Sequence, residues 1–340
     1  MRTTSERWLA RTRNLLPLGG LVLLLSACSE HGPQSFWGRP ESDFALILQE
    51  LFSQIVLLAA IVFVVVEAVL FIAVIRYRRR STDLPSQTHG NSTVEIVWTI
   101  APAVVLVFVA LPTVRTIFQS YHPPKEGTVQ VKAIGHQWWW EFQYPELGIT
   151  TANEVHFPVN QRATIEVESA DIIHGFWVPN LGGKRDAVPT RINELWWTPD
   201  RPGLYYGQCT QLCGTSHANM RLRAIVHEAA DWQSWVNAMK AGNAPPTGGD
   251  AQRGYQLVST GACIGCHTIQ GTPLQGKVGP NLTNFGQRTT MGAGMFENTK
   301  ANVVRWLKNP QEAKPGNKMP NLGLSDEDAS AIADYLESLR

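Results

Sequence analysis

Residues 209–220 read CTQLCGTSHANM and place two cysteines, a histidine and a methionine on one short loop. Thiolates, imidazoles and thioethers are soft or borderline donors, which favour copper over calcium, magnesium or manganese. Two thiolates on one loop can bridge two metal ions, with a histidine on each ion and weaker ligands at the remaining positions. The candidate ligands are Cys209, Cys213, His217 and Met220, together with His174 upstream and the backbone carbonyl of Gln211.

A disulfide between Cys209 and Cys213 is the alternative interpretation of this spacing. It is chemically reasonable in an exported domain, but it leaves the nearby histidines and methionine unexplained. The chain has five cysteines, and each has a proposed use, so no pair remains for a structural disulfide. The full donor set therefore favours a metal centre.

The sequence around the loop predicts a β-rich domain over residues 125–230. Apolar and polar residues alternate in the stretches 129–133, 164–167 and 221–226, and Pro, Gly and Asn separate them. Alternation with a period of two is typical of half-buried strands. Several such strands in about 100 residues predict a β-sandwich or a small Greek-key barrel. A loop between late strands can present metal ligands at one end of that fold.

Two apolar stretches precede this domain and predict membrane helices within residues 45–118. They cover about residues 51–75 and 96–117, which meets the roughly 20 residues needed to cross a bilayer. The loop between them begins with RYRRR at residues 76–80, and such basic loops remain in the cytoplasm. Both the mature N-terminus and everything after the second span are then exported. Glu67, inside the first span, is expected to pair within a helix interface, whereas Glu95, at the cytoplasmic mouth of the second, could be an interfacial anchor.

The N-terminus has the pattern of a bacterial export signal. Four arginines within residues 2–14 precede an apolar run at 15–25, which is too short to span a membrane. Residues 25–28 read LSAC and resemble a lipobox, which predicts a signal peptide over 1–27, a lipidated Cys28 and an exported segment over 28–44. An ordinary signal peptide cleaved nearby, or a short uncleaved anchor, is the alternative.

A second exported domain is predicted over residues 250–340, after a linker at 231–249. Cys263, Cys266 and His267 form C-x-x-C-H, the attachment signature of a c-type haem with the histidine as an axial ligand. A redox disulfide or half of a zinc site are alternatives, but no second cysteine pair is present for zinc. The preferred sixth ligand is Met319, with Met291 and Met295 as rivals. The pattern resembles an all-α class I cytochrome c, and the last helix should begin after Ser325.

Residues 45–228 resemble subunit II of the haem–copper cytochrome c oxidases. The resemblance rests on EIVWT at 95–99, GHQWWW at 135–140, DIIHGFWVP at 171–179, KRDAVP at 184–189 and the loop at 209–220. It implies that the sandwich at 125–230 is cupredoxin-like and that the six candidate ligands form a dinuclear copper-A centre in it. It also implies that Trp138 receives electrons and that Glu95 lies at the mouth of a proton channel. Gln211 stands where many members have Glu, which leaves the family's magnesium site in doubt.

With the haem motif, the resemblance extends to the caa-type oxidases. It implies an oxidase subunit that passes electrons from cytochrome c through its own haem and copper A to subunit I, where oxygen is reduced. Expected partners are subunit I, subunit III, a cytochrome c donor and the bacterial inner membrane, with both redox domains on the periplasmic side. The alternative is electron input to a nitric oxide reductase. The net charge of +1 gives no indication of nucleic acid binding.

Overall fold

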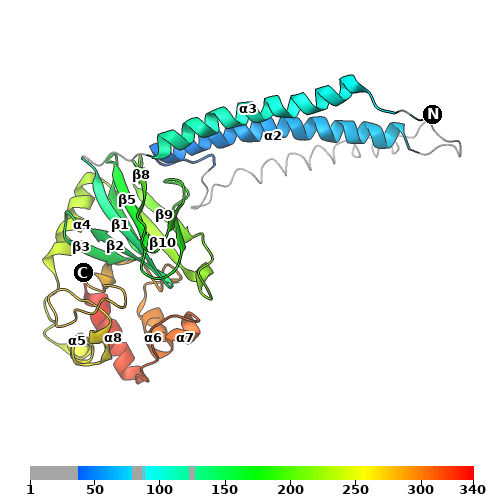
Figure 1. The fold of residues 1–340 in the computed structure, drawn as a ribbon. Coiled ribbons are helices and arrows are strands. Elements are labelled where there is room, and N and C mark those ends of the chain that lie inside the picture. The colour runs from blue at the N-terminus through cyan, green and yellow to red at the C-terminus, as the bar shows by residue number, and fades with distance from the viewer. Residues whose placement is uncertain (1–36, 79–86, 88, 122–126) are drawn as a thin grey trace, which may run out of the picture.

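The computed structural model describes residues 37–78, 87, 89–121 and 127–340. It contains a helical hairpin, a β-sandwich and a small helical domain, in that order along the chain (Figure 1). The predicted signal peptide and the lipidation site at Cys28 lie outside the described residues. The predicted fold class is confirmed in all three parts.

The hairpin consists of α2 (Asp43–Arg76) and α3 (Ser92–Tyr121), which lie side by side and extend away from the sandwich (Figure 1). Both helices are long and apolar enough to cross a membrane. Their apolar side chains are largely exposed in the isolated chain, as expected for surfaces that face lipid or other membrane subunits. The start of α2 and the end of α3 both adjoin the sandwich, so it lies at one end of the hairpin.

The first helix begins earlier than its apolar stretch because its first turn belongs to the sandwich. Ser42 caps the helix by accepting a hydrogen bond from the Ala45 amide at 3.0 Å. Asp43 accepts from the Thr198 amide at 2.7 Å and pairs with Arg162 at 3.0 Å. Phe44 is buried against Trp196. These contacts fix the hairpin to the domain that it anchors.

The sandwich has two five-stranded sheets that enclose the main hydrophobic core. The predicted strands at 129–133, 164–167 and 221–226 are confirmed as parts of β1 (Val129–His136), β5 (Ala163–Ser169) and β10 (Arg221–His227). The first sheet contains β3 (Ile149–Ala152), β2 (Trp139–Tyr144), β1 (Val129–His136), β5 (Ala163–Ser169) and β8 (Asn193–Trp197) in spatial order. The second contains β4 (Glu154–Pro158), β10 (Arg221–His227), β9 (Gly203–Cys209), β6 (His174–Trp177) and β7 (Arg185–Ala187).

The first part of the predicted linker is a helix instead. Residues of α4 (Ala229–Ala241) pack against the sandwich through Trp235, Val236 and Met239, all of which are buried. The Trp235 ring stacks on His156 with centroids 4.3 Å apart. Burial of these apolar side chains stabilises the helix, which leaves a shorter connection before the last domain.

The C-terminal domain is built around the crossing of its first and last helices. At that crossing the backbone of Gly254 lies so close to the last helix, α8 (Asp326–Ser338), that a Cβ atom would be 2.0 Å from the Ala331 carbonyl oxygen. The last helix begins after Ser325, which accepts from the Asp328 amide at 3.0 Å, as predicted. The elements of the C-terminal domain are α5 (Gly249–Thr260), 3₁₀ turns η2 (Ala262–Gly265) and η3 (Phe285–Gln287), β11 (Thr290–Met291), β12 (Phe296–Glu297), α6 (Lys300–Lys308), α7 (Pro310–Ala313) and α8 (Asp326–Ser338).

Candidate metal and haem centres

Two neighbouring strands bring the predicted copper ligands together. The loop at 209–220 connects β9 to its antiparallel neighbour β10, and it contains the short 3₁₀ turn η1 (His217–Asn219). The first residue of β6 is His174, and β6 pairs with β9 so that Phe176 lies opposite Cys209. His174 therefore reaches the start of the loop although 35 residues separate it from Cys209.

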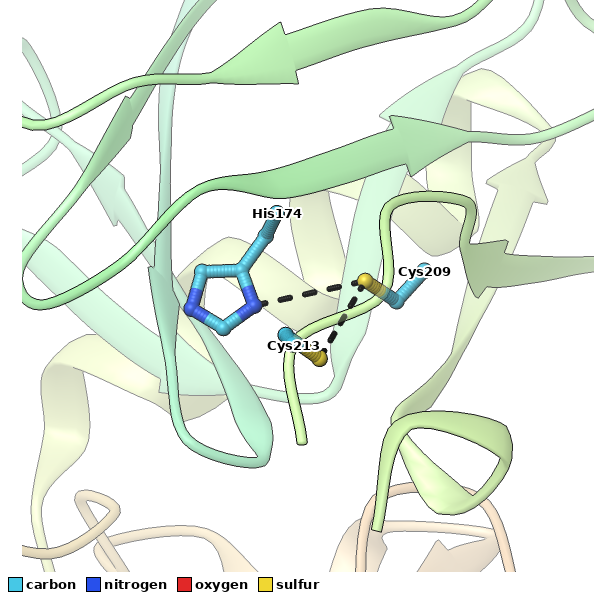
Figure 2. Close-up of side chains that lie close together, drawn as sticks. All are labelled: His174, Cys209 and Cys213. Atoms are coloured by element: carbon cyan, nitrogen blue, oxygen red, sulfur yellow. Dashed lines mark hydrogen bonds between the residues drawn. The ribbon is translucent and has the colours of Figure 1, made fainter. Parts of the chain in front are cut away.

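The donor atoms converge at spacings that suit metal ions. Figure 2 shows the side chains of His174, Cys209 and Cys213 pointing toward one another, with their donor atoms within 4.8 Å and all three residues buried. The two cysteines are free, with sulfurs 3.8 Å apart. Bonds of about 2.3 Å to sulfur and 2.0 Å to nitrogen place two donors on one tetrahedral ion about 3.5 Å apart. The observed spacing therefore fits metal ions held by these residues.

The other three candidates lie in the same shell. His217 Nδ1 is 3.5 Å and Met220 Sδ is 3.9 Å from Cys213 Sγ. The Gln211 carbonyl oxygen is 3.3 Å from Cys209 Sγ. The two thiolates are thus central, each with a different histidine nearest to it. This donor set of two thiolates, two imidazoles, a thioether and a carbonyl is suited to copper.

Hydrogen bonding and burial prepare these ligands for a metal. Asp171 Oδ1 lies 2.8 Å from His174 Nε2, which leaves Nδ1 of that imidazole facing the sulfurs. Burial lowers the pKa of His174, so its imidazole is neutral and available to coordinate. Burial and the nearby Cys209 raise the pKa of Cys213 to about 12. A metal ion that binds here must therefore displace a proton from this thiol.

The side chain of Gln211 points away from the sulfurs to a carboxylate. Its Nε2 donates to Asp186 Oδ1 at 3.1 Å. An amide can donate to Asp186, whereas a glutamate here would place two carboxylates together and would require a proton or a cation between them. Glutamine in place of glutamate at position 211 therefore keeps the backbone carbonyl in position and gives Asp186 a hydrogen-bond donor from the same chain.

The C-x-x-C-H motif lies at the 3₁₀ turn that follows α5. His267 Nδ1 lies 2.8 Å from the Pro280 carbonyl oxygen, which leaves Nε2 free to bind iron. Burial lowers the pKa of His267 and keeps the imidazole neutral. The apolar side chains of Ile264, within the motif, and Val278, two residues before Pro280, are 39% and 64% exposed. An apolar macrocycle attached here would cover such surface, so these residues fit a haem.

The structure treats the three candidate methionines differently. Met319 lies on the segment between α7 and α8, packs against the domain core, and its sulfur accepts from Trp306 Nε1 at 3.1 Å. Met291 lies in β11 and is buried within the same core. Met295 follows a turn in which its amide bonds to the Met291 carbonyl. Met319 remains the preferred axial ligand because its sulfur is held by a defined donor beside the core.

The predicted electron acceptor Trp138 contacts the copper loop directly. Its Nε1 donates to the Cys213 carbonyl oxygen at 2.9 Å, and the Gln137 side chain donates to the same oxygen at 2.8 Å. Only 8% of Trp138 is exposed. The ring is therefore fixed beside one of the central thiolates, as a residue on an electron path should be.

The two carboxylates of the hairpin lie apart from these centres. Glu95 is in the first turn of α3, the end of that helix remote from the sandwich, and its Oε1 accepts from the Asn91 amide at 3.2 Å. Glu67 is exposed on α2, so its expected partner is not supplied by the part of the chain that the structure describes. The channel role of Glu95 stays a prediction.

Three family models match successive parts of the chain. They describe the transmembrane domain of cytochrome c oxidase subunit II over residues 40–116, its periplasmic domain over 147–229, and cytochrome c over 251–340. A cytochrome c oxidase subunit 2 of Alkalihalophilus pseudofirmus is 38% identical over 98% of this chain and 98% of its own length. That of Bacillus subtilis is 32% identical over 96% and 98%, respectively.

A solved structure is similar to the sandwich alone. It is the periplasmic domain of subunit II of cytochrome oxidase from Bradyrhizobium japonicum, 36% identical, covering 35% of this chain and 96% of that chain with a TM-score of 0.34.

Together, the hairpin, the sandwich with its soft-donor loop and the C-x-x-C-H domain define a membrane-anchored redox protein with an exported domain. The chain belongs to the cytochrome c oxidase subunit II family, with a cytochrome c domain at its C-terminus. Its domain types imply copper and haem binding and assembly with other oxidase subunits.

One contact between the two redox domains has no counterpart in the sequence analysis. Lys318, next to Met319, lies 3.4 Å from Asp171, and Asp171 in turn holds the imidazole of His174. Nothing in the local pattern around Lys318 marks it as a partner of a residue 147 positions away. Only the fold reveals that the two candidate centres share this boundary.

Proposed function

We propose that this chain accepts electrons from a cytochrome c donor and passes them, through a haem c on Cys263 and Cys266 and a dinuclear copper-A centre, to the oxygen-reducing centre of subunit I. Haem iron and copper supply reversible one-electron redox chemistry when they are bound. His267 and Met319 would hold the iron. The copper ligands would be His174, Cys209, Gln211 through its carbonyl, Cys213, His217 and Met220.

The link from Lys318 through Asp171 to His174 is the observation that carries this proposal. It joins the residue beside the candidate iron ligand to a candidate copper ligand by two polar contacts of 3.4 and 2.8 Å. Two centres meant to exchange electrons need a fixed and close arrangement, which a contact at this position supports. A tethered donor domain also has a high effective concentration at its acceptor.

The proposed location is the bacterial inner membrane, with both redox domains on the periplasmic side. The basic loop at residues 76–80 supports a cytoplasmic position for the far end of the hairpin. The sandwich adjoins the opposite end of the hairpin. This orientation suits haem attachment and copper loading outside the cytoplasm.

Gas consumption by the purified complex tests the reaction. With reduced cytochrome c as the donor, we expect the complex that contains this chain to consume oxygen. Nitric oxide consumption without oxygen consumption would instead assign the chain to a nitric oxide reductase. The same preparation identifies subunits I and III by mass spectrometry.

Replacing Met319 with alanine should open the sixth coordination position of the haem. Carbon monoxide then binds to the reduced haem of the purified chain, whereas the wild-type haem, with both axial positions filled, excludes it. The Met291→Leu variant is the matched control and should exclude carbon monoxide as the wild type does. Visible difference spectra measure this binding. The assignment fails if carbon monoxide binds to the Met291 variant and not to the Met319 variant.

A further inference from the structure

A buried lysine joins the C-terminal domain to the copper-binding domain. Lys314 follows α7 and is only 3% exposed. Its Nζ donates to the carbonyl oxygens of Trp138 at 2.6 Å, Asn219 at 2.9 Å and Gly292 at 3.0 Å. The first two carbonyls belong to the copper-binding domain, and the third belongs to the lysine's own domain.

The three carbonyls use the full donor capacity of an ammonium group. No carboxylate is among them, so the contact depends on the geometry of three backbone segments rather than on a single opposite charge. Burial lowers the pKa of Lys314 to about 7, and the carbonyl oxygens solvate its protonated form in place of water. An apolar replacement would leave three buried acceptors without this donor, which is a costly arrangement.

Further hydrogen bonds extend the same boundary on both sides of the lysine. Ser216 Oγ donates to the Pro315 carbonyl at 2.6 Å. The Arg221 amide donates to the Ala293 carbonyl at 3.1 Å, and the Arg223 guanidinium donates to the Gly294 carbonyl at 3.1 Å. Most of these contacts involve backbone atoms, which hold a defined relative position of the two domains.

The same boundary continues at the buried carboxylate of Glu154, which is 1% exposed and lies opposite Arg223 on the neighbouring strand. Its Oε1 accepts from the amides and hydroxyls of Thr289 and Thr290 at 2.7–2.9 Å. Glu154 begins β4, whereas the two threonines precede and begin β11. These contacts widen the boundary between the two domains.

The docked position covers the tryptophan beside the copper loop. Gly316 has a φ of +82°, and a Cβ atom on it would lie 3.0 Å from the Trp138 ring. The backbone of the haem domain thus lies directly against that ring, while Lys314 binds the carbonyl of the same residue. A donor protein that approaches the copper loop from this side meets the haem domain first.

We propose that Lys314 is a positioning residue that fixes the haem domain over the copper-binding loop, and that this pose excludes an external donor protein from Trp138. This inference rests on the proposed function and deepens it, because it makes the haem domain the receiving surface for the donor. The lysine acts through the docked pose, since its three hydrogen bonds go to the backbone carbonyls of Trp138, Asn219 and Gly292.

The test compares Lys314→Met with wild type in the purified full chain, loaded with copper and haem in detergent. Methionine has a similar volume and no donor. Lys308→Met is the matched control, since Lys308 lies in the same domain and forms only an exposed pair with Asp326 at 2.8 Å. Hydrogen exchange of peptides across 216–223 and 290–296 measures how often the boundary between the two domains opens. Exchange of α8 measures the stability of the haem domain's own fold. Hydroxyl-radical oxidation measures the solvent access of Trp138.

We expect exchange at the boundary to be faster by about tenfold in Lys314→Met, because charge-assisted hydrogen bonds that hold it closed are lost. Oxidation of Trp138 should rise severalfold, exchange of α8 should stay at the wild-type rate, and Lys308→Met should match wild type throughout. Unchanged boundary exchange and Trp138 oxidation overturn the inference. A parallel rise in α8 exchange overturns it as well, because Lys314 would then support the haem domain's own fold.

A variant on the opposite side of the boundary keeps the docked pose testable without altering the haem domain. Arg223→Met removes the contact to the Gly294 carbonyl and should also increase Trp138 oxidation, by less than Lys314→Met does. Failure of the two ideas is distinguishable. A wild-type chain without copper or haem absorbance contradicts the proposed function, whereas a loaded wild-type chain whose Trp138 is oxidised as fast as in Lys314→Met contradicts only the docking.

Discussion

The Cys213→Ser variant is expected to lose the near-infrared copper absorbance and to keep the haem c spectrum. Cys213 Sγ lies within 3.9 Å of Cys209 Sγ, of His217 Nδ1 and of Met220 Sδ. Its loss therefore removes a donor that neighbours three others of the set. A serine hydroxyl is a hard donor that stays protonated at neutral pH. Copper affinity should fall by at least about 100-fold, since loss of an outer-shell partner alone costs 10–100-fold.

Absorbance spectra together with metal analysis of the purified chain measure this loss. Leu212→Ala is the control, because Leu212 is on the same loop with its side chain 83% exposed and offers no donor atom. It should bind copper as wild type does. If the near-infrared absorbance survived in Cys213→Ser, the two-thiolate centre would be the wrong assignment for this loop.

The double variant Cys263→Ala, Cys266→Ala should lose covalent haem entirely. Two thioether bonds attach a c-type haem, so removal of both sulfurs leaves at most a dissociable cofactor. Acidified organic solvent should extract all haem from the variant and none from wild type, as measured by absorbance of the extract and by the mass of the chain. Because the copper loop is in another domain, its near-infrared absorbance should remain.

The control for haem attachment is Met319→Ala, which alters only the proposed axial ligand. Its haem should resist extraction as in wild type. Haem that remained attached to the double alanine variant would contradict attachment at C-x-x-C-H, and the free cysteines of the domain would then have some other role.

The parts of the molecule that follow from short-range patterns could be predicted from the sequence. The copper loop and the haem motif each gather their donors within a few residues, and hydrophobic periodicity marks both membrane helices and several strands. The start of α2 was not evident, because Phe44 is buried by the distant Trp196 and not by its own helix. Helix α4 had a usable signal in Trp232, Trp235 and Met239 at helical spacing, although its stacking on His156 required the fold.

The boundary between the redox domains could not be predicted for a different reason. Lys314 is an ordinary charged residue in its own segment, and its partners Trp138 and Asn219 offer only backbone carbonyls. Every residue has a backbone carbonyl, so the residue types do not show which carbonyls accept a hydrogen bond from a lysine. Sequence alone therefore does not distinguish such a lysine from an exposed one. Its burial depends on contacts between residues that are up to 176 positions apart.

The close approach of Gly316 to Trp138 gives a comparative marker that other chains of this architecture can be checked against. A side chain at that place would press on the indole ring, which would have to shift by a few tenths of an ångström, and the backbone conformation already favours glycine. Fused relatives that dock their haem domain in this pose should therefore keep a glycine there, paired with a lysine two positions earlier. Relatives whose haem domain moves freely have no reason to keep either residue. The lysine–glycine pair would therefore distinguish chains with a docked haem domain from chains with a mobile one.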